Sequence, residues 1–292
     1  MTKAPEVKFP FYRNYRDSKS HMNTSIMALL VGANLASNTL ELTSRSPVTI
    51  AKIFPETAHI DRFDLTSESA QDVLNNSEAH VSLIAIPQIM SYHEHYMMRI
   101  LKFAKEHGIE ISSNEIGGLN LSKVHEKLEE KLGGNISPEL LELVQLLRLI
   151  RNSIIHRNGE ASSTLKDSIS EASTEVKEIW AELVPNSPIE EVVSSDNRIN
   201  INAGHIILAL AATKRIEREV NTLLQNSISV DEWASIAVED FNQSTSAIKN
   251  SSKWRRSLLG YVRLNYGCVE INEAQLEAAA SRLGYWTKPT WT

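Results

Sequence analysis

The stretch that decides the fold runs from Ser137 to Gly159 and reads SPELLELVQLLRLIRNSIIHRNG. Ser137 is a typical N-cap, and Pro138 suits the first helical turn because its fixed φ is helical and its missing N–H is not needed there. A glycine such as Gly159 commonly follows a helix C-terminus. About 21 residues give a helix about 31 Å long. Its apolar positions cover too wide an arc for a surface helix, so we expect a central helix packed on several sides; they are Leu140, Leu141, Val144, Leu147, Ile150, Ile154 and Ile155.

Helix signals also dominate the sequence on both sides of this stretch, and alternating strand patterns are few. The sequence therefore predicts a mostly α protein. The expected helices are a short one from Thr66 to about Val73, a long one from Ser77 to Gly108 that Pro87 should kink, Leu121 to Leu132 ended by Gly133 and Gly134, Ser163 to about Leu183, Ala203 to Leu224 capped by Asn202, one starting near Val230 after a Ser229/Glu232 capping box, Lys253 to Leu264, and Glu273 to Leu283 capped by Asn272. A small hairpin is expected to pair Val192 and Val193 with Ile199 and Ile201.

Three domains are predicted from these patterns. Residues 1–64 form an N-terminal extension of unknown role, with a helix around Asn23 to Asn38. Residues 65–225 form the main helical domain. A change of composition after Asn226 predicts a small helical C-terminal domain over residues 226–292.

Composition limits the functions to consider. The formal charge of −6 over 292 residues argues against non-specific electrostatic binding of nucleic acid by the whole surface. Any contact with RNA must therefore be local. The single cysteine, Cys268, excludes an internal disulfide and a multi-cysteine zinc cluster. The N-terminus lacks the layout of a signal peptide, and the apolar stretch from Ile26 to Ala36 is far shorter than the roughly 20 residues of a membrane span. We expect a cytoplasmic protein that does not enter membranes.

Arg151, Asn152 and His156 lie together near the end of the predicted central helix. At 100° per residue, Asn152 and His156 lie about 40° apart, whereas Arg151 lies about 140° from His156. One helix is therefore not expected to aim Arg151 and His156 at the same atom. A two-fold dimer that crosses two such helices could bring both pairs together over one phosphodiester.

The run Arg151-Asn152-Ser153-Ile154-Ile155-His156 resembles the motif of the HEPN superfamily, which has Arg, a polar residue, mostly apolar residues and then His. The resemblance extends more loosely over residues 65–225, and it implies a compact helical bundle with an active site built by two protomers. It implies a ribonuclease that needs no metal or cofactor, because the RNA 2′-hydroxyl is the nucleophile. His156 would act as general base or acid, and Arg151 would hold phosphate oxygens. Asn152 would orient His156 or the scissile phosphate. The expected products carry 2′,3′-cyclic phosphate and 5′-hydroxyl ends.

Other residues are weaker candidates for the site. His93 and Glu94, on the helix that the resemblance places beside the motif, and Arg157 are interpreted as possible substrate contacts. The His93-Glu94-His95 run lacks the spacing of helical zinc ligands, so no metal site is predicted. Arg and His near a helix end can also be there only because they interact favourably with the last carbonyls.

Three functions remain open at this point. The first is an RNA-cleaving toxin or antiviral-defence effector, controlled by a neutralising or sensor protein. The second is a non-catalytic HEPN-like module that binds a partner protein or a nucleotide. The third is a regulator whose tail binds DNA, suggested by its short helices and by Lys253, Arg255 and Arg256 around Trp254.

Overall fold

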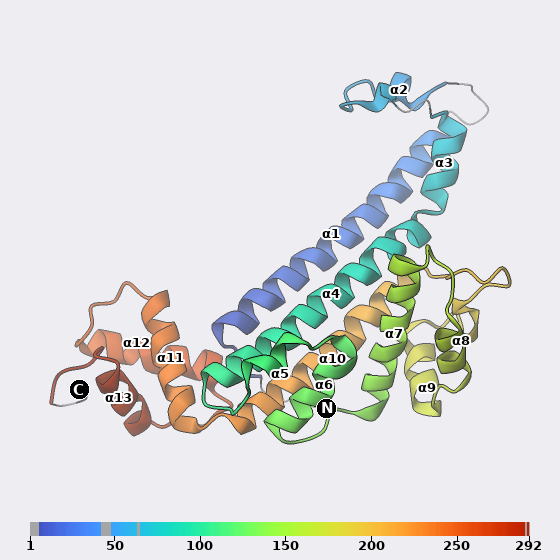
Figure 1. Ribbon diagram of the computed structural model, residues 1–292. Helices are drawn as coiled ribbons and strands as arrows, with labels where there is room; N and C mark the ends of the chain where they lie inside the picture. Colours follow the sequence, from blue (N-terminus) through green and yellow to red (C-terminus); the bar gives the residue numbers. More distant parts are fainter. Residues whose placement is uncertain (1–5, 42–47, 63–64, 290, 292) are drawn as a thin grey trace. The chain divides into compact units, whose positions relative to one another are not determined.

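The computed structural model describes residues 6–41, 48–62, 65–289 and 291. The chain is mostly α, as predicted, and within the described ranges β-structure is limited to isolated bridges (Figure 1). The α-helices are α1 Pro10–Glu41, α2 Ile50–Ile53, α3 Ser67–Asn75, α4 Ser77–Glu106, α5 Ser113–Gly117, α6 Leu121–Leu132, α7 Pro138–His156, α8 Ser163–Ser170, α9 Thr174–Leu183, α10 Ala203–Ser227, α11 Val230–Ser244, α12 Ser252–Tyr266 and α13 Glu273–Arg282.

Local capping explains why several helices begin where the sequence predicts. The Thr66 side chain accepts a hydrogen bond from the Ser69 amide at the start of α3, 3.2 Å away. Asn202 accepts in the same way from the Gly204 amide at the start of α10. At α13, Asn272 and Gln275 exchange hydrogen bonds between side chains and backbone amides and so form a full capping box. Each cap satisfies amides that the first helical turn leaves without a partner.

The predicted central helix is confirmed as α7, which begins at Pro138. Its buried residues occupy several faces, as expected for a helix packed on more than one side; they are Leu140, Leu143, Val144, Leu146, Leu147, Leu149, Ile150 and Ser153. The prediction was wrong for Ile155, whose side chain is 52% exposed. The last turn of α7 therefore leaves the core and faces solvent.

Three other predictions needed correction, and one helix was not predicted. α1 is 32 residues long and begins at Pro10, well before the helix expected around Asn23. The single helix expected from Ser163 to Leu183 is two helices, because Ser173 starts a new one. The expected hairpin is reduced to one antiparallel bridge between Val193 and Ile199, beside the 3₁₀ turn Ile189–Val192. The short α5, missed in the sequence, opens with a capping box from Ser112.

The described residues form two compact units, each made of separate stretches of sequence. Unit 1 contains the described residues up to Ser18, then Tyr92–Leu141, and those from Thr213 onward. Unit 2 contains the described residues of Lys19–Ser91 and Glu142–Ala212. The long helices α1, α4, α7 and α10 each contribute residues to both units. The three-domain division predicted from composition stays a prediction.

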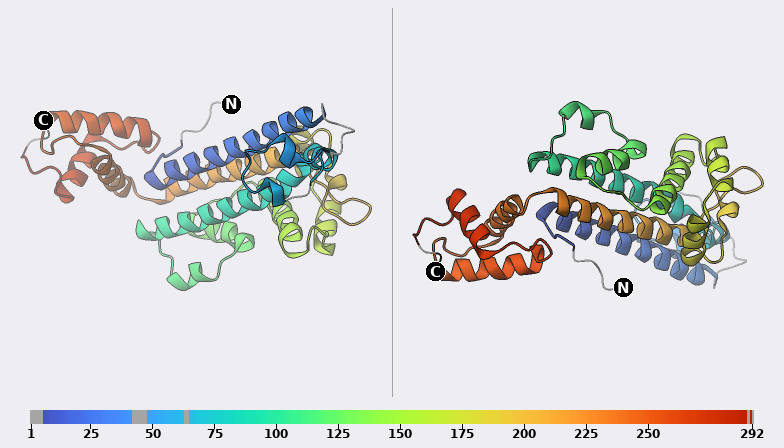
Figure 2. Two further views of the ribbon diagram at one scale, coloured as in Figure 1. Left: turned by 90° about the horizontal axis from the view of Figure 1, so that it is seen from above. Right: turned by 90° about the horizontal axis from the view of Figure 1, so that it is seen from below.

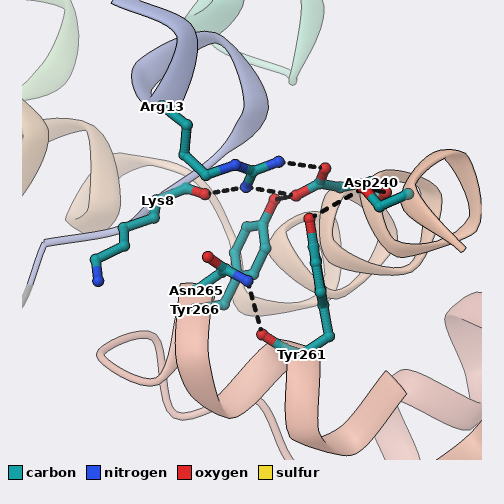
Figure 3. A network of polar contacts seen from close by, with 7 residues as sticks. Lys8, Arg13, Asp240, Tyr261, Asn265 and Tyr266 are labelled. Atoms are coloured by element: carbon teal, nitrogen blue, oxygen red, sulfur yellow. Dashed lines mark hydrogen bonds and ion pairs between the residues drawn. The ribbon is translucent and has the colours of Figure 1, made fainter. Parts of the chain in front are cut away.

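A buried charge network ties the N-terminal segment of unit 1 to its C-terminal helices (Figure 3). Asp240 on α11 is almost fully buried, and its carboxylate accepts two hydrogen bonds from Arg13 at 2.8 and 2.9 Å. The Tyr266 hydroxyl donates a third at 2.6 Å, and Arg13 also donates to the Lys8 carbonyl. Burial and the Asp240 carboxylate raise the pKa of Tyr266 well above its ordinary value, so this hydroxyl keeps its proton.

The C-terminal helices of unit 1 bury several large aromatic rings among aliphatic side chains. α11 packs against α12 and α13, and the two further views show these helices together (Figure 2). The Trp233 indole on α11 is buried among aromatic rings from the N-terminal segment, α4 and α12; these are Phe9, Phe103 and Tyr266. Large buried rings contribute much of the apolar area that stabilises such a unit.

In unit 2, the start of α9 lies beside α7. The Glu142 carboxylate on α7 accepts hydrogen bonds from both the amide and the hydroxyl of Ser173, at 2.8 and 2.7 Å. Ser173 caps α9, so this contact places the start of α9 beside α7. The Trp180 indole on α9 is buried, with its edge toward the His205 ring. Among the described residues no helix has the length and apolar character to cross a membrane.

Candidate functional site

The three predicted catalytic side chains meet at the solvent-facing end of α7. Nη1 of Arg151 lies 3.0 Å from Oδ1 of Asn152 and 3.4 Å from Nε2 of His156. His156 is exposed, and Arg151 and Asn152 are partly exposed. All three belong to unit 2. The cluster can therefore meet a molecule arriving from solvent.

This convergence corrects the expectation that one helix could not aim Arg151 and His156 at a common point. The helical angle of about 140° describes where the Cα–Cβ bonds point. It does not count the reach of the arginine stem, which carries the guanidinium over Asn152 to the imidazole in the last turn. Arg151 and His156 therefore contact each other within one chain, and the active site built by two protomers stays a prediction.

The contact between Arg151 and His156 has a consequence for the imidazole tautomer. A guanidinium has only donors, so Nε2 of His156 must accept in this contact. The ring proton is then assigned to Nδ1, and Nε2 carries a lone pair toward the centre of the cluster. In this contact the guanidinium occupies that lone pair, so Nε2 can accept a proton from a substrate only when Arg151 turns to another acceptor such as a phosphate oxygen.

The Ser153 carbonyl, in the last turn of α7, is paired with backbone amides and not with the three side chains. The Ser153 carbonyl accepts hydrogen bonds from the amides of Arg157 and Gly159. Asn158 and Gly159 both have positive φ, 52° and 82°, and turn the chain away from the helix axis. Capping of this carbonyl therefore does not account for the presence of Arg151, Asn152 and His156 at the helix end.

Arg198 is a member of this surface that sequence reasoning missed. Its Nη1 donates to the Asn158 carbonyl at 2.7 Å, and its backbone pairs with Glu160 in an antiparallel bridge. The signal that could have found it is the predicted hairpin over residues 192–201, which contains Arg198. Arg151, the exposed Arg157 and Arg198 thus lie together at the end of α7, with the carboxylates of Glu160 and Asp196 next to Arg198.

His93 and Glu94, the other predicted substrate contacts, lie on α4 in unit 1, whereas the cluster belongs to unit 2. The His93 ring is fully buried, with Nε2 3.0 Å from Nε2 of His125 and Nδ1 3.6 Å from the Glu217 carboxylate. A ring without exposed surface offers nothing to a substrate from solvent, so a structural role suits His93 better. Glu94 is partly exposed.

Other candidate sites carry less chemistry. Trp254, the centre of the basic cluster in the tail, is fully buried against Trp286 and Trp291, so it cannot stack on a base. Unit 1 also has two hollows. One, of about 580 Å³, is lined by residues of α4 and α5, and the other, of about 280 Å³, is lined by residues of α11 and α13. Within the described ranges, no three His, Cys, Asp or Glu side chains are placed to hold a metal ion.

The fold and this cluster define an all-α protein with an exposed Arg-Asn-His group at one helix end. Comparison with known proteins adds no relative, since no protein-family model, no curated protein and no solved structure matches the chain.

Proposed function

We propose that the chain is an endoribonuclease of HEPN type, and that the cluster at the end of α7 cleaves RNA without a metal ion. The observation that supports this most strongly is the convergence of Arg151, Asn152 and His156 on one solvent-facing point. Their proximity follows in part from their positions within six residues of one helix, and the structure adds that the side chains turn toward one another and toward solvent. The proposal accounts for this arrangement.

The chemistry would use each side chain once. Nε2 of His156 removes the proton from the RNA 2′-hydroxyl, and the resulting oxygen attacks the adjacent phosphorus. The Arg151 guanidinium holds the non-bridging oxygens as negative charge develops on them, and the Asn152 side-chain oxygen holds the guanidinium in place. The bond to the 5′-oxygen breaks, that oxygen takes a proton from water, and His156 gives the proton it had accepted to solvent. The products are a 2′,3′-cyclic phosphate and a 5′-hydroxyl.

Local charge supports RNA as the substrate. Arg157 and Arg198 are exposed beside the cluster and can contact phosphates on either side of the scissile one. Such contacts are few, so we expect weak binding that falls as salt is added. A toxin or antiviral-defence effector, restrained by a partner protein in the cytoplasm, is the cellular role that this activity suits.

An RNA digest in excess chelator tests the proposal. Wild type should cleave a single-stranded RNA and leave 2′,3′-cyclic ends, whereas His156→Ala and Arg151→Ala should each lose cleavage by about 100-fold or more. His80→Ala, a change at an exposed histidine of α4, is the matched control and should cleave like wild type. Cleavage that requires a divalent metal, or that survives His156→Ala, would refute the proposal. RNA binding without cleavage by the wild type would favour a non-catalytic module instead.

A further inference from the structure

The helix α12 in unit 1 carries cations and no acid. Its 15 residues include four Lys and Arg and no Asp or Glu. Residues 245–292, which contain α12, have seven Lys and Arg and three Asp and Glu, a formal charge of +4, whereas the rest of the chain has −10. The overall charge of −6 is thus the sum of an acidic main part and a cationic tail.

The exposed residues of α12 lie on one side of the helix. At 100° per residue they lie within an arc of about 140°; they are Ser252, Lys253, Arg256, Ser257, Gly260, Arg263 and Leu264. The three cations among them, Lys253, Arg256 and Arg263, lie within about 80° of one another and are called the α12 cations below. The opposite side of α12 is buried, with Trp254 and Leu258 fully covered. The helix is therefore anchored in unit 1 while these cations face solvent.

The α12 cations are available to a ligand. Among the described residues their side chains make no ion pair and no hydrogen bond. The fourth cation of the helix, Arg255, is engaged instead, because its guanidinium pairs with the Glu273 carboxylate of α13 at 2.5 Å. In α11, which packs against α12, three of the four acidic residues are hydrogen-bonded to residues of other elements; they are Asp231, Glu232 and Asp240.

The face between the α12 cations is low and mostly polar. Ser257 and Gly260 lie between Arg256 and Arg263 along the helix, and a Cβ added to Gly260 would meet no atom within 4 Å. The α12 cations span about 15 Å of helix axis, about the length of four stacked nucleotides. Leu264, 71% exposed, is the one large apolar side chain on this face. A polyanion can therefore approach the helix backbone closely.

A nucleic-acid strand suits this face better than a protein or a membrane does. Protein interfaces depend on aromatic and aliphatic anchors, and this face offers Leu264 alone. A helix that lies on a membrane inserts its apolar side, and the apolar side of α12 is buried within the protein. Phosphates, by contrast, are held by Lys and Arg without an apolar anchor.

We propose that the α12 cations bind RNA through its phosphates, as a contact surface additional to the cluster at the end of α7. That cluster belongs to unit 2 and α12 to unit 1, so the two sets of residues are distinct. The choice of RNA over DNA rests on the proposed function, because contacts to phosphates read neither base nor sugar.

Fluorescence anisotropy with a labelled single-stranded RNA tests this surface. The full chain carries His156→Ala so that the RNA stays intact, and chelator is present. Replacing all three α12 cations by glutamine should weaken binding by about 100-fold at about 50 mM salt; the substitutions are Lys253→Gln, Arg256→Gln and Arg263→Gln. The slope of log affinity against log salt should become shallower by about 2, because three contacts to a single strand are lost.

A matched control separates these contacts from the general charge of the chain. It replaces three exposed lysines outside the tail and changes the formal charge by the same amount; the substitutions are Lys52→Gln, Lys123→Gln and Lys214→Gln. This variant should bind RNA within about twofold of its parent, because its lysines make no local contact with the strand.

A single added carboxylate tests the same face with its cations intact. Gly260→Glu should weaken RNA binding by about 10-fold, because the carboxylate opposes the phosphates. Its melting temperature should not fall, since glutamate favours a helix more than glycine does and the space at Gly260 is open. Gly32→Glu, at an exposed glycine of α1 that is equally open, is the control and should bind like the parent.

An RNA affinity that the glutamine variant of the α12 cations leaves unchanged would overturn the proposal, as would equal losses in the lysine control. Binding of DNA but not RNA of the same sequence would overturn it too, and so would binding of phosphatidylserine vesicles through the α12 cations without RNA binding. The proposed ribonuclease fails separately. RNA binding that needs the α12 cations, in a wild type that cleaves no RNA, would refute the cleavage and support this surface.

Discussion

Replacing Arg13 by methionine tests how unit 1 holds its buried carboxylate. The change keeps most of the apolar stem and removes both hydrogen bonds to Asp240, whose side chain is only 3% exposed. Tyr266 and the neighbouring Tyr261 then remain to stabilise the charge. Removing one partner of a buried ion pair costs about 3 to 5 kcal/mol. Because the Arg13 side chain is 30% exposed, water can replace part of its effect, and we expect a loss of about 2 to 4 kcal/mol.

Urea denaturation followed by tryptophan fluorescence measures this loss. Trp233 is fully buried in the same unit and reports its unfolding. A loss of this size should lower the urea midpoint by about 1 M or more. Arg16→Met is the matched control, because Arg16 pairs with Glu6 at the surface with 46% of its side chain exposed, and such pairs contribute about 0 to 1 kcal/mol.

A double-mutant cycle isolates the pair from other effects of the substitution. Asp240→Asn retains a group that Tyr266 can contact but removes the charge. If Arg13 acts through Asp240, the double variant should be less destabilised than the sum of the single variants by about 1 kcal/mol or more. Equal losses from Arg13→Met and Arg16→Met, or strict additivity in the cycle, would refute the reasoning.

Two further predictions concern acid stability and the intrachain site. Burial, and then the neighbouring His93, lower the pKa of His125 to about 3, and burial lowers the pKa of His205 to about 4. Both pKa values lie below the ordinary value of about 6.5, so between these values the unfolded chain binds more protons than the folded chain. The free energy of unfolding should therefore be unaffected by these rings above pH 6.5. As the pH falls from 6.5 toward 4, it should decrease by up to about 1.4 kcal/mol per pH unit for each ring. Urea midpoints from pH 7 to 4.5 check this, and the slope should become shallower in His125→Phe; an unchanged slope would contradict it. If each chain carries a complete catalytic set, mixing inactive Arg151→Ala with inactive His156→Ala should restore no RNA cleavage, whereas recovery would show that one protomer's arginine works with its partner's histidine.

The sequence by itself determined the parts of this protein that depend on neighbouring residues. The starts of α3, α10 and α13 follow from Thr66, Asn202 and Asn272, because a cap hydrogen-bonds an amide two or three residues away. The end of α6 follows from Gly133, whose φ of 69° suits glycine. The composition of the candidate site, Arg151, Asn152 and His156, was likewise evident from local spacing.

Only the tertiary structure decided what depends on distant residues. The first turns of α1 are held by contacts such as the hydrogen bond between Tyr15 and Glu217, which are 202 residues apart. The position of α9 beside α7 depends on Glu142, which lies 31 residues before Ser173 and accepts its amide and hydroxyl hydrogen bonds. Exposure of the last turn of α7 and the placement of Arg198 beside it depend in the same way on packing and on contacts across some 40 residues. A local sequence pattern does not specify which residues from distant parts of the chain will pack against it. That packing decides whether a side chain is buried in the core or stays exposed to a ligand.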